Sequence, residues 1–318
     1  VVRSSALMED QAGSTFAGQF ESFLGLESED DFITAVRACW AALWASRARQ
    51  YMTHHHITPA DTAMGLLIQP LVEARASGGG MSLTANKGML LTATWGLGSA
   101  IAQGEIVPDR YDLDRNGTLC DTVVGHKDHS VHCVHHQVGP SAQAVAAPRV
   151  QEPCLNEKQI KELSDLLVRA EDLLGKPVEI EWAQDEAGFK MLQARPLKME
   201  PAQVPDEIWL RHPGIKGHPS GIGWGSGRAC VINCECELSR LAPGDILVTK
   251  VAGPALSQVL PRVSGVVAEL GGSTSHLASL ARERGIPMVL GVPEATRKIP
   301  DGVQVGVDGV MGMVRWIN

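Results

Sequence analysis

A histidine that directly follows a glycine-rich turn and three hydroxyl residues is the first feature that could do chemistry. The segment reads GGSTSH over residues 271–276, with an apolar run before it and an apolar pattern of helical spacing after it. A strand, a turn and a helix start place His276 in the first turn of a helix, where free backbone N–H groups and the helix dipole favour an anion. An imidazole there suits a nucleophile that accepts a phosphoryl group. The alternative is a helix-capping turn with an incidental surface histidine.

The longer stretch GGSTSHLASLARERGIPMVLGV, residues 271–292, resembles the phosphohistidine segment of the phosphoenolpyruvate-utilising enzymes. This family includes pyruvate phosphate dikinase, phosphoenolpyruvate synthase, rifampicin phosphotransferase and phenylphosphate synthase. The resemblance implies that His276 carries the phosphoryl group. Leu277 stands where the family usually has a small residue, and this should alter the packing beside the histidine more than its chemistry.

A second segment, IEWAQDEAGFKMLQARP at residues 180–196, resembles the closing hairpin of the ATP-grasp domain in the same family. The resemblance implies that Glu181 and Gln193 hold Mg²⁺ beside the ATP phosphates and that Arg195 contacts phosphate. The residues agree with this, because two antiparallel strands can turn both side chains to one pocket and Mg²⁺ prefers oxygen ligands that it shares with phosphates. The alternative is an exposed hairpin with a Glu–Arg ion pair.

The beginning of the chain, VRSSALMED at residues 2–10, resembles another ATP-grasp segment of the family. The resemblance implies that Arg3 reaches the ATP phosphates, for which the forked guanidinium is well suited. A surface ion pair of Arg3 with Glu9 or Asp10 is the alternative.

Several elements must position these residues. The clearest helix is amphipathic, covers residues 157–175 and ends at Gly175. Apolar residues at helical spacing also predict a helix over residues 30–53, and residues 64–84 read as a strand, a turn and a second strand.

Histidine-rich and cysteine-rich segments compete as possible metal sites. GHKDHSVHCVHHQVG, residues 125–139, favours a solvated strand over a zinc site, because zinc needs three or four ligands that converge, usually from separate elements. The adjacent histidines 54–56 cannot all point to one ion from regular structure and favour a helix end. The seven cysteines are interpreted as reduced thiols, and Cys230, Cys234 and Cys236 as core thiols rather than metal ligands.

The composition is that of a globular protein with room for two domains in 318 residues, since 44% of them are hydrophobic and 20% are charged. A net charge of −8 with only 4% aromatic residues gives no reason to expect nucleic-acid binding. No apolar run reaches membrane-spanning length and no signal peptide is evident, so we expect a cytoplasmic protein.

The resemblance therefore predicts an α/β protein: the C-terminal part of an ATP-grasp domain followed by a swivelling β/β/α phosphohistidine domain. We expect these over residues 1–200 and 214–318, with a linker at 201–213. The N-terminal ATP-grasp lobe and an acceptor-binding module are expected on a second subunit, with Val1 as a natural start; a chain that has been cut is the alternative.

The implied function is a dikinase-type phosphotransfer from ATP through phosphohistidine to an acceptor hydroxyl, with release of AMP and phosphate. Split relatives in the family phosphorylate phenols, so a phenol or cresol is the expected acceptor. A phosphoenolpyruvate synthase-like reaction on pyruvate and a non-catalytic regulatory subunit are the alternatives.

Overall fold

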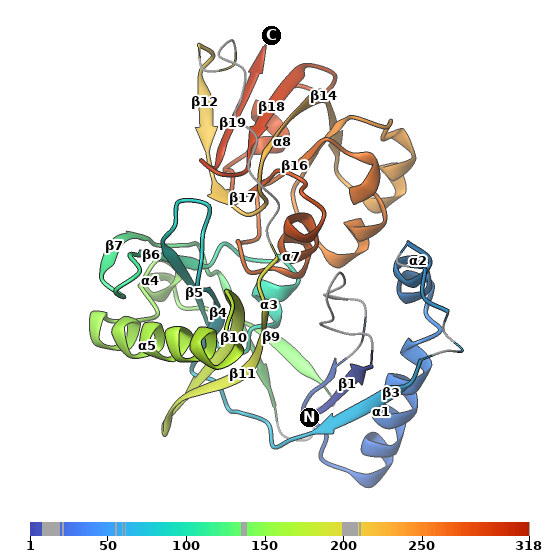
Figure 1. Ribbon diagram of the computed structural model, residues 1–318, viewed down its shortest axis with the longest axis vertical. Helices are drawn as coiled ribbons and strands as arrows, with labels where there is room; N and C mark the ends of the chain where they lie inside the picture. Colours follow the sequence, from blue (N-terminus) through green and yellow to red (C-terminus); the bar gives the residue numbers. More distant parts are fainter. Residues whose placement is uncertain are drawn as a thin grey trace.

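The computed structural model describes residues 1–7, 20, 22–54, 56–58, 60, 62–134, 139–198, 209 and 211–317. These residues form a mixed α/β structure with two large sheets and two small ones (Figure 1). Most of the predicted linker 201–213 lies outside the described residues, so the linker and the domain limits around it stay predictions. None of the helices in the described part of the chain has the length and apolar composition that crossing a bilayer requires.

The N-terminal strands form a three-stranded antiparallel sheet in the order β2-β1-β3. Its strands are β1 (Val2–Ala6), β2 (Ser22–Phe23) and β3 (Met64–Ile68). Helix α1 (Glu29–Ala42) packs on this sheet through Ala35 and Cys39. The helix predicted over residues 30–53 is divided, because the chain turns at residues 43–45 before α2 (Ser46–His54).

A six-stranded antiparallel sheet forms the second part, in the order β11-β10-β4-β5-β6-β7. Its strands are β4 (Ala76–Met81), β5 (Met89–Trp95), β6 (Asp109–Leu113), β7 (Leu119–Val123), β10 (Val178–Asp185) and β11 (Gly188–Pro196). The two strands predicted within residues 64–84 are present, but β3 and β4 belong to different sheets, so they do not form a hairpin.

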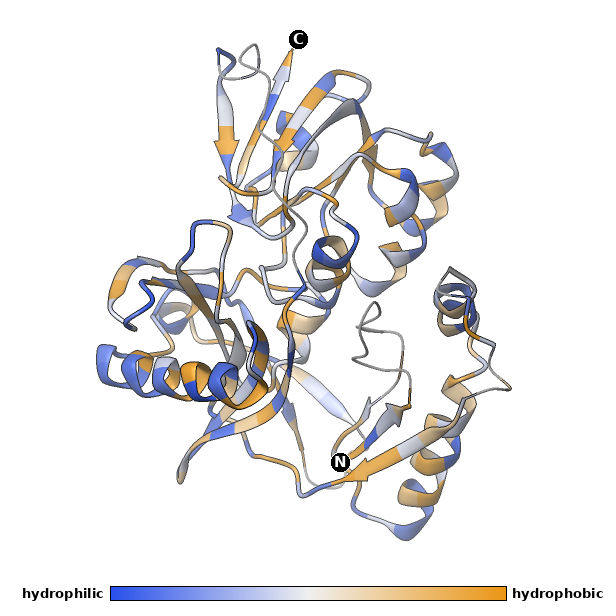
Figure 2. Cartoon of the chain, in the orientation of Figure 1, coloured by the Kyte–Doolittle hydropathy of each residue, from blue (hydrophilic) through white to orange (hydrophobic). Residues whose placement is uncertain are grey.

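Helix α5 (Glu157–Leu174) covers one face of this sheet, as its amphipathic pattern predicts (Figure 2). Asn156 and Gln159 form a capping box at its start, and Gly175 ends it in the left-handed conformation that glycine adopts without strain. Ile160, Leu163 and Leu167 are buried against Trp182 and its neighbours in the sheet. Smaller elements complete this part: α3 (Ser99–Ala102), α4 (Ala147–Val150), and the pair β8 (His129–Cys133) and β9 (Pro140–Ala144).

The C-terminal part is built on an eight-stranded mixed sheet in the order β12-β19-β18-β14-β15-β16-β17-β13. Its strands are β12 (Gly214–Lys216), β13 (His218–Pro219), β14 (Trp224–Ile232), β15 (Ile246–Thr249), β16 (Gly265–Ala268), β17 (Met288–Leu290), β18 (Gln304–Asp308) and β19 (Met313–Ile317). Strands β14, β15, β16 and β17 run parallel. Helix α8 (Ala295–Lys298) packs on one face of the sheet.

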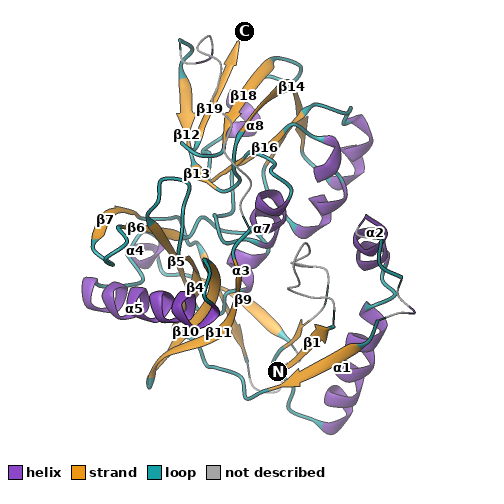
Figure 3. Cartoon of the chain, viewed as in Figure 1, coloured by secondary structure: helices purple, strands orange, loops and turns teal. Residues whose placement is uncertain are grey.

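Helix α7 (His276–Glu283) packs on the other face of the C-terminal sheet, together with the 3-10 helices η3 (Pro254–Gln258) and η4 (Leu260–Arg262). Figure 3 shows α7 between the two large sheets. The same apolar cluster includes Tyr51 and Met52 of α2, so α2 also packs against the C-terminal part. The three parts of the chain therefore meet around α7.

Candidate active site

The predicted helix start at His276 is present. Strand β16 leads into a turn in which Gly271 has a φ of +103°, and Ser275 caps α7 by accepting a hydrogen bond from the backbone N–H of Ala278 at 3.2 Å. His276 is the first residue of the helix and is half-buried. Its position at the positive end of the helix favours a negatively charged group beside the imidazole.

Three predicted ATP-site residues lie together at the junction of two sheets. Glu181 on β10 and Gln193 on β11 are direct cross-strand partners, and Arg3 of β1 approaches both. The Arg3 Nη2 atom donates to Gln193 Oε1 at 3.0 Å and lies 3.7 Å from Glu181 Oε2. Arg3 thus pairs with the predicted site residues; the alternative partners Glu9 and Asp10 lie outside the described residues.

Arg195, the fourth predicted residue of the ATP site, is buried and contacts a carboxylate. Its Nη2 atom lies 3.3 Å from Glu179 Oε2 and donates to Ser279 Oγ at 3.0 Å. Ser279 belongs to α7, one turn after His276, so Arg195 joins the hairpin to the histidine helix.

A buried polar network extends this contact across the two large sheets. Glu179 Oε1 accepts from Arg282 Nη2 at 2.7 Å and from Ser279 Oγ at 2.9 Å. Arg282 also donates to the backbone carbonyls of Ser220 and Ser273. Burial would raise the pKa of Glu179, but Arg282 and Arg195 outweigh it and hold this pKa below its ordinary value. The carboxylate therefore stays ionised and ties α7 to strand β10.

A second contact between the sheets lies just before the histidine. The hydroxyl oxygens of Thr92 on β5 and Thr274 are 2.7 Å apart. A methyl group added at Gly79 of β4 would meet Cβ of Thr274 at 2.7 Å, closer than side chains approach. The glycine lets the turn before His276 seat directly on the six-stranded sheet.

The electrostatic surroundings of His276 keep its ring neutral. Burial lowers the pKa of His276, Arg195 lowers it further, and Glu181 opposes them. A neutral imidazole has a free lone pair, as a nucleophile requires. His276 of the C-terminal part and the Glu181 region of the hairpin are thus brought within electrostatic reach of each other.

Sequence reasoning did not identify three members of this site: Glu179, Ser279 and Arg282. A signal was present, because Glu179 and Glu181 are two residues apart on one strand and so point to the same face. Likewise Ser279 follows His276 by one helical turn. Neither pattern alone distinguishes a site residue from an ordinary surface position, and the pairing partners come from distant segments.

The competing metal sites receive no support from the described residues, among which no group of three or more His, Cys, Asp or Glu side chains is placed to hold a metal ion. Strand β8 covers His129 to Cys133, with Ser130 and Val131 buried and His126 exposed before it. His135 and His136 lie outside the described residues. Helix α2 ends at His54, which agrees with the predicted helix end at the adjacent histidines.

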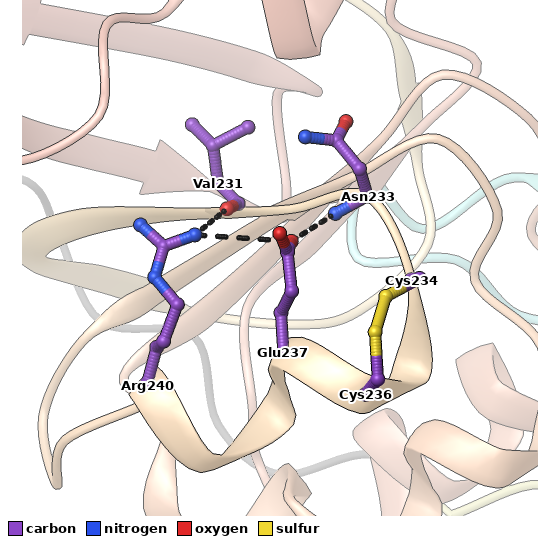
Figure 4. The surroundings of a disulfide bond; sticks show 6 residues. All are labelled: Val231, Asn233, Cys234, Cys236, Glu237 and Arg240. Carbon is purple, nitrogen blue, oxygen red and sulfur yellow. Dashed lines mark hydrogen bonds and ion pairs between the residues drawn. A yellow bond between two sulfur atoms is a disulfide. The ribbon is translucent and has the colours of Figure 1, made fainter.

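The prediction of reduced core thiols is wrong for two of the seven cysteines. Cys234 and Cys236 form a disulfide bond and are exposed, while Cys230 is buried in β14 as predicted (Figure 4). The reason is that the chain leaves β14 before Cys234 and turns into the 3-10 helix η2 (Glu235–Arg240), which is held by a hydrogen bond from Asn233 N–H to Glu237 at 2.9 Å. The apolar run that predicts a core strand ends at Ile232.

Two family models match the chain. The model described as pyruvate phosphate dikinase, AMP/ATP-binding domain, matches residues 1–210, and the model described as PEP-utilising enzyme, mobile domain, matches residues 241–312. This order confirms the predicted fold class, an ATP-binding domain followed by a mobile domain.

Curated relatives are similar along almost the whole chain. The phosphoenolpyruvate synthase of Pyrococcus furiosus is 34% identical over 333 residues, which cover 98% of this chain and 40% of that protein. The phosphoenolpyruvate synthase of Escherichia coli is 31% identical over 332 residues, which cover 98% of this chain and 42% of that protein. This chain therefore spans less than half the length of either relative.

A solved structure of aconitase X from Thermococcus kodakaraensis, in its holo-form, aligns with 33% of this chain and 99% of that chain. The sequence identity is 22% and the TM-score is 0.28.

Proposed function

Because the chain belongs to the family of the pyruvate phosphate dikinase AMP/ATP-binding domain, here joined to a mobile domain of the PEP-utilising enzymes, we propose that it transfers a phosphoryl group from ATP through His276 to an acceptor hydroxyl. The observation that supports this most is the position of His276, which heads α7 and lies within electrostatic reach of Glu181 and Arg195 on the ATP-binding side. A histidine placed there can reach a nucleotide held by that side.

In the proposed first step, the neutral imidazole of His276 attacks a phosphorus atom of ATP. By analogy with the family the attack is on the β-phosphorus: the bond between the imidazole nitrogen and this phosphorus forms, the α–β phosphoanhydride bond breaks, and AMP leaves. Water then cleaves the remaining phosphoanhydride bond of the pyrophosphorylated histidine, which releases phosphate and leaves phosphohistidine. Arg3 supplies positive charge beside the phosphates, where a fixed guanidinium stabilises the charge that develops in the transition state. The free N–H groups at the start of α7 add to this stabilisation.

The side chains of Glu181 and Gln193 fit a Mg²⁺ ion shared with the nucleotide. This assignment is supported by the position of both side chains beside one positive group, because Gln193 Oε1 and Glu181 Oε2 lie 3.0 and 3.7 Å from Arg3 Nη2. Two protein oxygens, phosphate oxygens and water form the kind of ligand set that Mg²⁺ takes in ATP-dependent enzymes. The ion would neutralise charge on the phosphates and hold them for attack.

In the proposed second step, the mobile domain leaves the ATP-binding side and offers phosphohistidine to the acceptor. A swivel is needed because one histidine must visit two pockets.

The direct test is labelling of His276. The assembled enzyme, meaning this chain with any partner subunit, should gain acid-labile phosphate from ATP labelled in the transferred phosphoryl group. His276→Asn should abolish this labelling, while the exposed histidine variant His126→Asn should label like the wild type. Equal labelling of His276→Asn and wild type would reject the proposal, and so would a wild type that never labels, which is the behaviour of a non-catalytic subunit.

The acceptor is the finer part of the proposal. The sequence resemblance supports a phenol or cresol, and the similarity to phosphoenolpyruvate synthases supports pyruvate. Phosphorylated enzyme is freed of ATP and mixed with either phenol or pyruvate. The label should pass to the true acceptor within one turnover and should stay on the enzyme in the presence of the other compound. Transfer to phenol but not to pyruvate supports the aryl acceptor, and the reverse result supports a phosphoenolpyruvate synthase.

We also propose a second subunit that supplies an N-terminal ATP-grasp lobe and an acceptor-binding module. Co-purification of the tagged chain from its own cells, followed by gel filtration, would detect a stable complex. A chain that labels and transfers as a monomer would contradict this part.

A further inference from the structure

A polar pocket of about 340 Å³ lies at the opposite end of α7 from His276. It opens between helix α2 and the segment that carries η3 and η4, two regions whose apolar residues share one core cluster. Its walls are Arg47, Gln50, Tyr51, Ser257, Gln258, Pro261 and Arg284. Seven helical steps put about 10 Å along the axis between His276 and the end of α7 at Glu283. The lining includes none of the predicted ATP-site residues, although Arg47 is close enough to His276 to help lower its pKa.

Arg284 is the feature of this pocket that calls for a ligand. Its Nε and Nη1 atoms are buried and have no hydrogen-bond partner within the described part of the chain. The guanidinium lies over the ring of Tyr51, 5.8 Å from the ring centroid, which holds it in place without using its N–H groups. Buried donors without an acceptor cost free energy, so such groups usually mark a missing partner.

Two of the side chains that line the pocket, Arg47 and Arg284, carry positive charge, and among the described residues the lining includes no carboxylate. The nearby carboxylate Glu283 accepts a hydrogen bond from the Tyr51 hydroxyl and does not line the pocket. Six of the seven lining side chains can hydrogen-bond, and the amides and hydroxyls among them suit oxygen atoms.

The chemistry that fits is an oxyanion. A guanidinium offers a fork of N–H donors that matches a phosphate better than a spherical anion. Burial of the Arg284 side chain lowers its pKa; Tyr51 and Glu283 offset part of this effect, and a bound anion would offset more of it. A phosphate-sized group also fits the volume with room for ordered water.

We propose that the Arg47–Arg284 pocket binds a phosphate-type oxyanion, and that the bound anion bridges α2 to the mobile domain. Arg47 and Tyr51 lie on one side of the bridge and Ser257, Gln258 and Arg284 on the other. Because both walls are present together only when the mobile domain sits against α2, occupancy stabilises this docked arrangement. The site would let the concentration of free phosphate or of a phosphorylated metabolite set the fraction of docked enzyme.

Hydrogen–deuterium exchange of the full chain tests the proposal without any phosphotransfer assay. Inorganic phosphate is compared with chloride at equal ionic strength. When the phosphate concentration is about ten times the dissociation constant, hydrogen exchange should be about tenfold slower in peptides from α2 and from residues 254–262. Arg284→Leu should lose this protection, whereas Arg297→Leu, which removes an exposed arginine from the same domain, should keep it.

Arg284→Lys provides a second variant, because it keeps the charge but not the forked donors; it should retain part of the protection. The strands β14 to β16 serve as an internal control, since unchanged exchange there shows that each variant is folded. Absence of phosphate-dependent protection in the wild type, or equal protection in Arg284→Leu, would overturn the proposal. Neither result would bear on the labelling of His276, so the two proposals fail separately.

Discussion

Replacing Glu179 by glutamine should weaken the docking of the mobile domain on the ATP-binding side. The Glu179 carboxylate accepts hydrogen bonds from Arg282 at 2.7 Å and from Ser279 at 2.9 Å, and it lies 3.3 Å from Arg195. Its side chain is only 8% exposed. Removing the negative charge leaves two buried guanidinium groups without their carboxylate, while the shape of the side chain is kept.

The size of the effect follows from the burial of these groups. Removing one partner of a buried, hydrogen-bonded ion pair typically costs about 3–5 kcal/mol. The lower end of this range applies here for two reasons. Arg282 keeps its hydrogen bonds to two backbone carbonyls, and the amide oxygen of the new glutamine can still accept a hydrogen bond. A loss of about 3 kcal/mol corresponds to a fall of roughly 100-fold in the docking equilibrium.

The assay is the single-turnover rate of His276 phosphorylation by labelled ATP in the assembled enzyme. Glu179→Gln should label roughly 100-fold more slowly wherever docking limits the rate. The matched control is Glu186→Gln, which removes a carboxylate from the exposed turn of the same hairpin and should label at the wild-type rate. The double variant Glu179→Gln with Arg282→Met should recover part of the loss, because the unpaired buried charge is then gone.

Two results would refute this reasoning. One is a labelling rate for Glu179→Gln within twofold of the wild type, which would mean that the pair does not support docking. The other is additivity of the two single changes in the double variant, which would mean that the residues do not act together.

Three other outcomes are expected. Gly79→Ala should slow labelling while urea unfolding stays near that of the wild type, because the new methyl group meets Thr274 on the mobile domain; unchanged labelling would contradict the docked arrangement. Labelling should persist below the ordinary histidine pKa of about 6.5, because burial lowers the pKa of His276; an NMR titration with a midpoint above 6.5 would contradict this. Burial also lowers the pKa of His218 to about 4. As the pH falls, this histidine is therefore protonated in the unfolded chain before it is protonated in the folded one, and the free energy of unfolding should fall by about 3 kcal/mol between pH 6.5 and pH 4. Urea unfolding of His218→Leu should lack this part of the pH dependence.

Much of the fold was predictable because its signals are local. The amphipathic pattern and the terminal glycine of α5 specify a helix whatever surrounds it. The hairpin of β10 and β11 follows from two strand patterns and a short turn, but the turn alone would set Glu181 opposite Leu192; a register shift between Glu181 and Trp182 brings Gln193 opposite Glu181. The glycine-rich turn and Ser275 likewise place His276 at a helix start from sequence alone.

Local sequence patterns did not predict the structure where packing against distant segments determines the path of the chain. The break between α1 and α2 is one case, because α1 packs on the N-terminal sheet and α2 packs against the C-terminal part. Nothing local predicts that β3 and β4 enter different sheets, because strand pairing is a long-range choice.

The sequence by itself determined which groups can do chemistry: an imidazole after a glycine-rich turn, two oxygen ligands on paired strands, and the arginines beside them. Only the tertiary structure decided that Glu179, Ser279 and Arg282 join these groups, and that two arginines from opposite ends of the chain line one pocket. The physical reason is that hydrogen bonds and ion pairs act over a few ångströms. Residues about a hundred positions apart come that close only when the whole chain has folded.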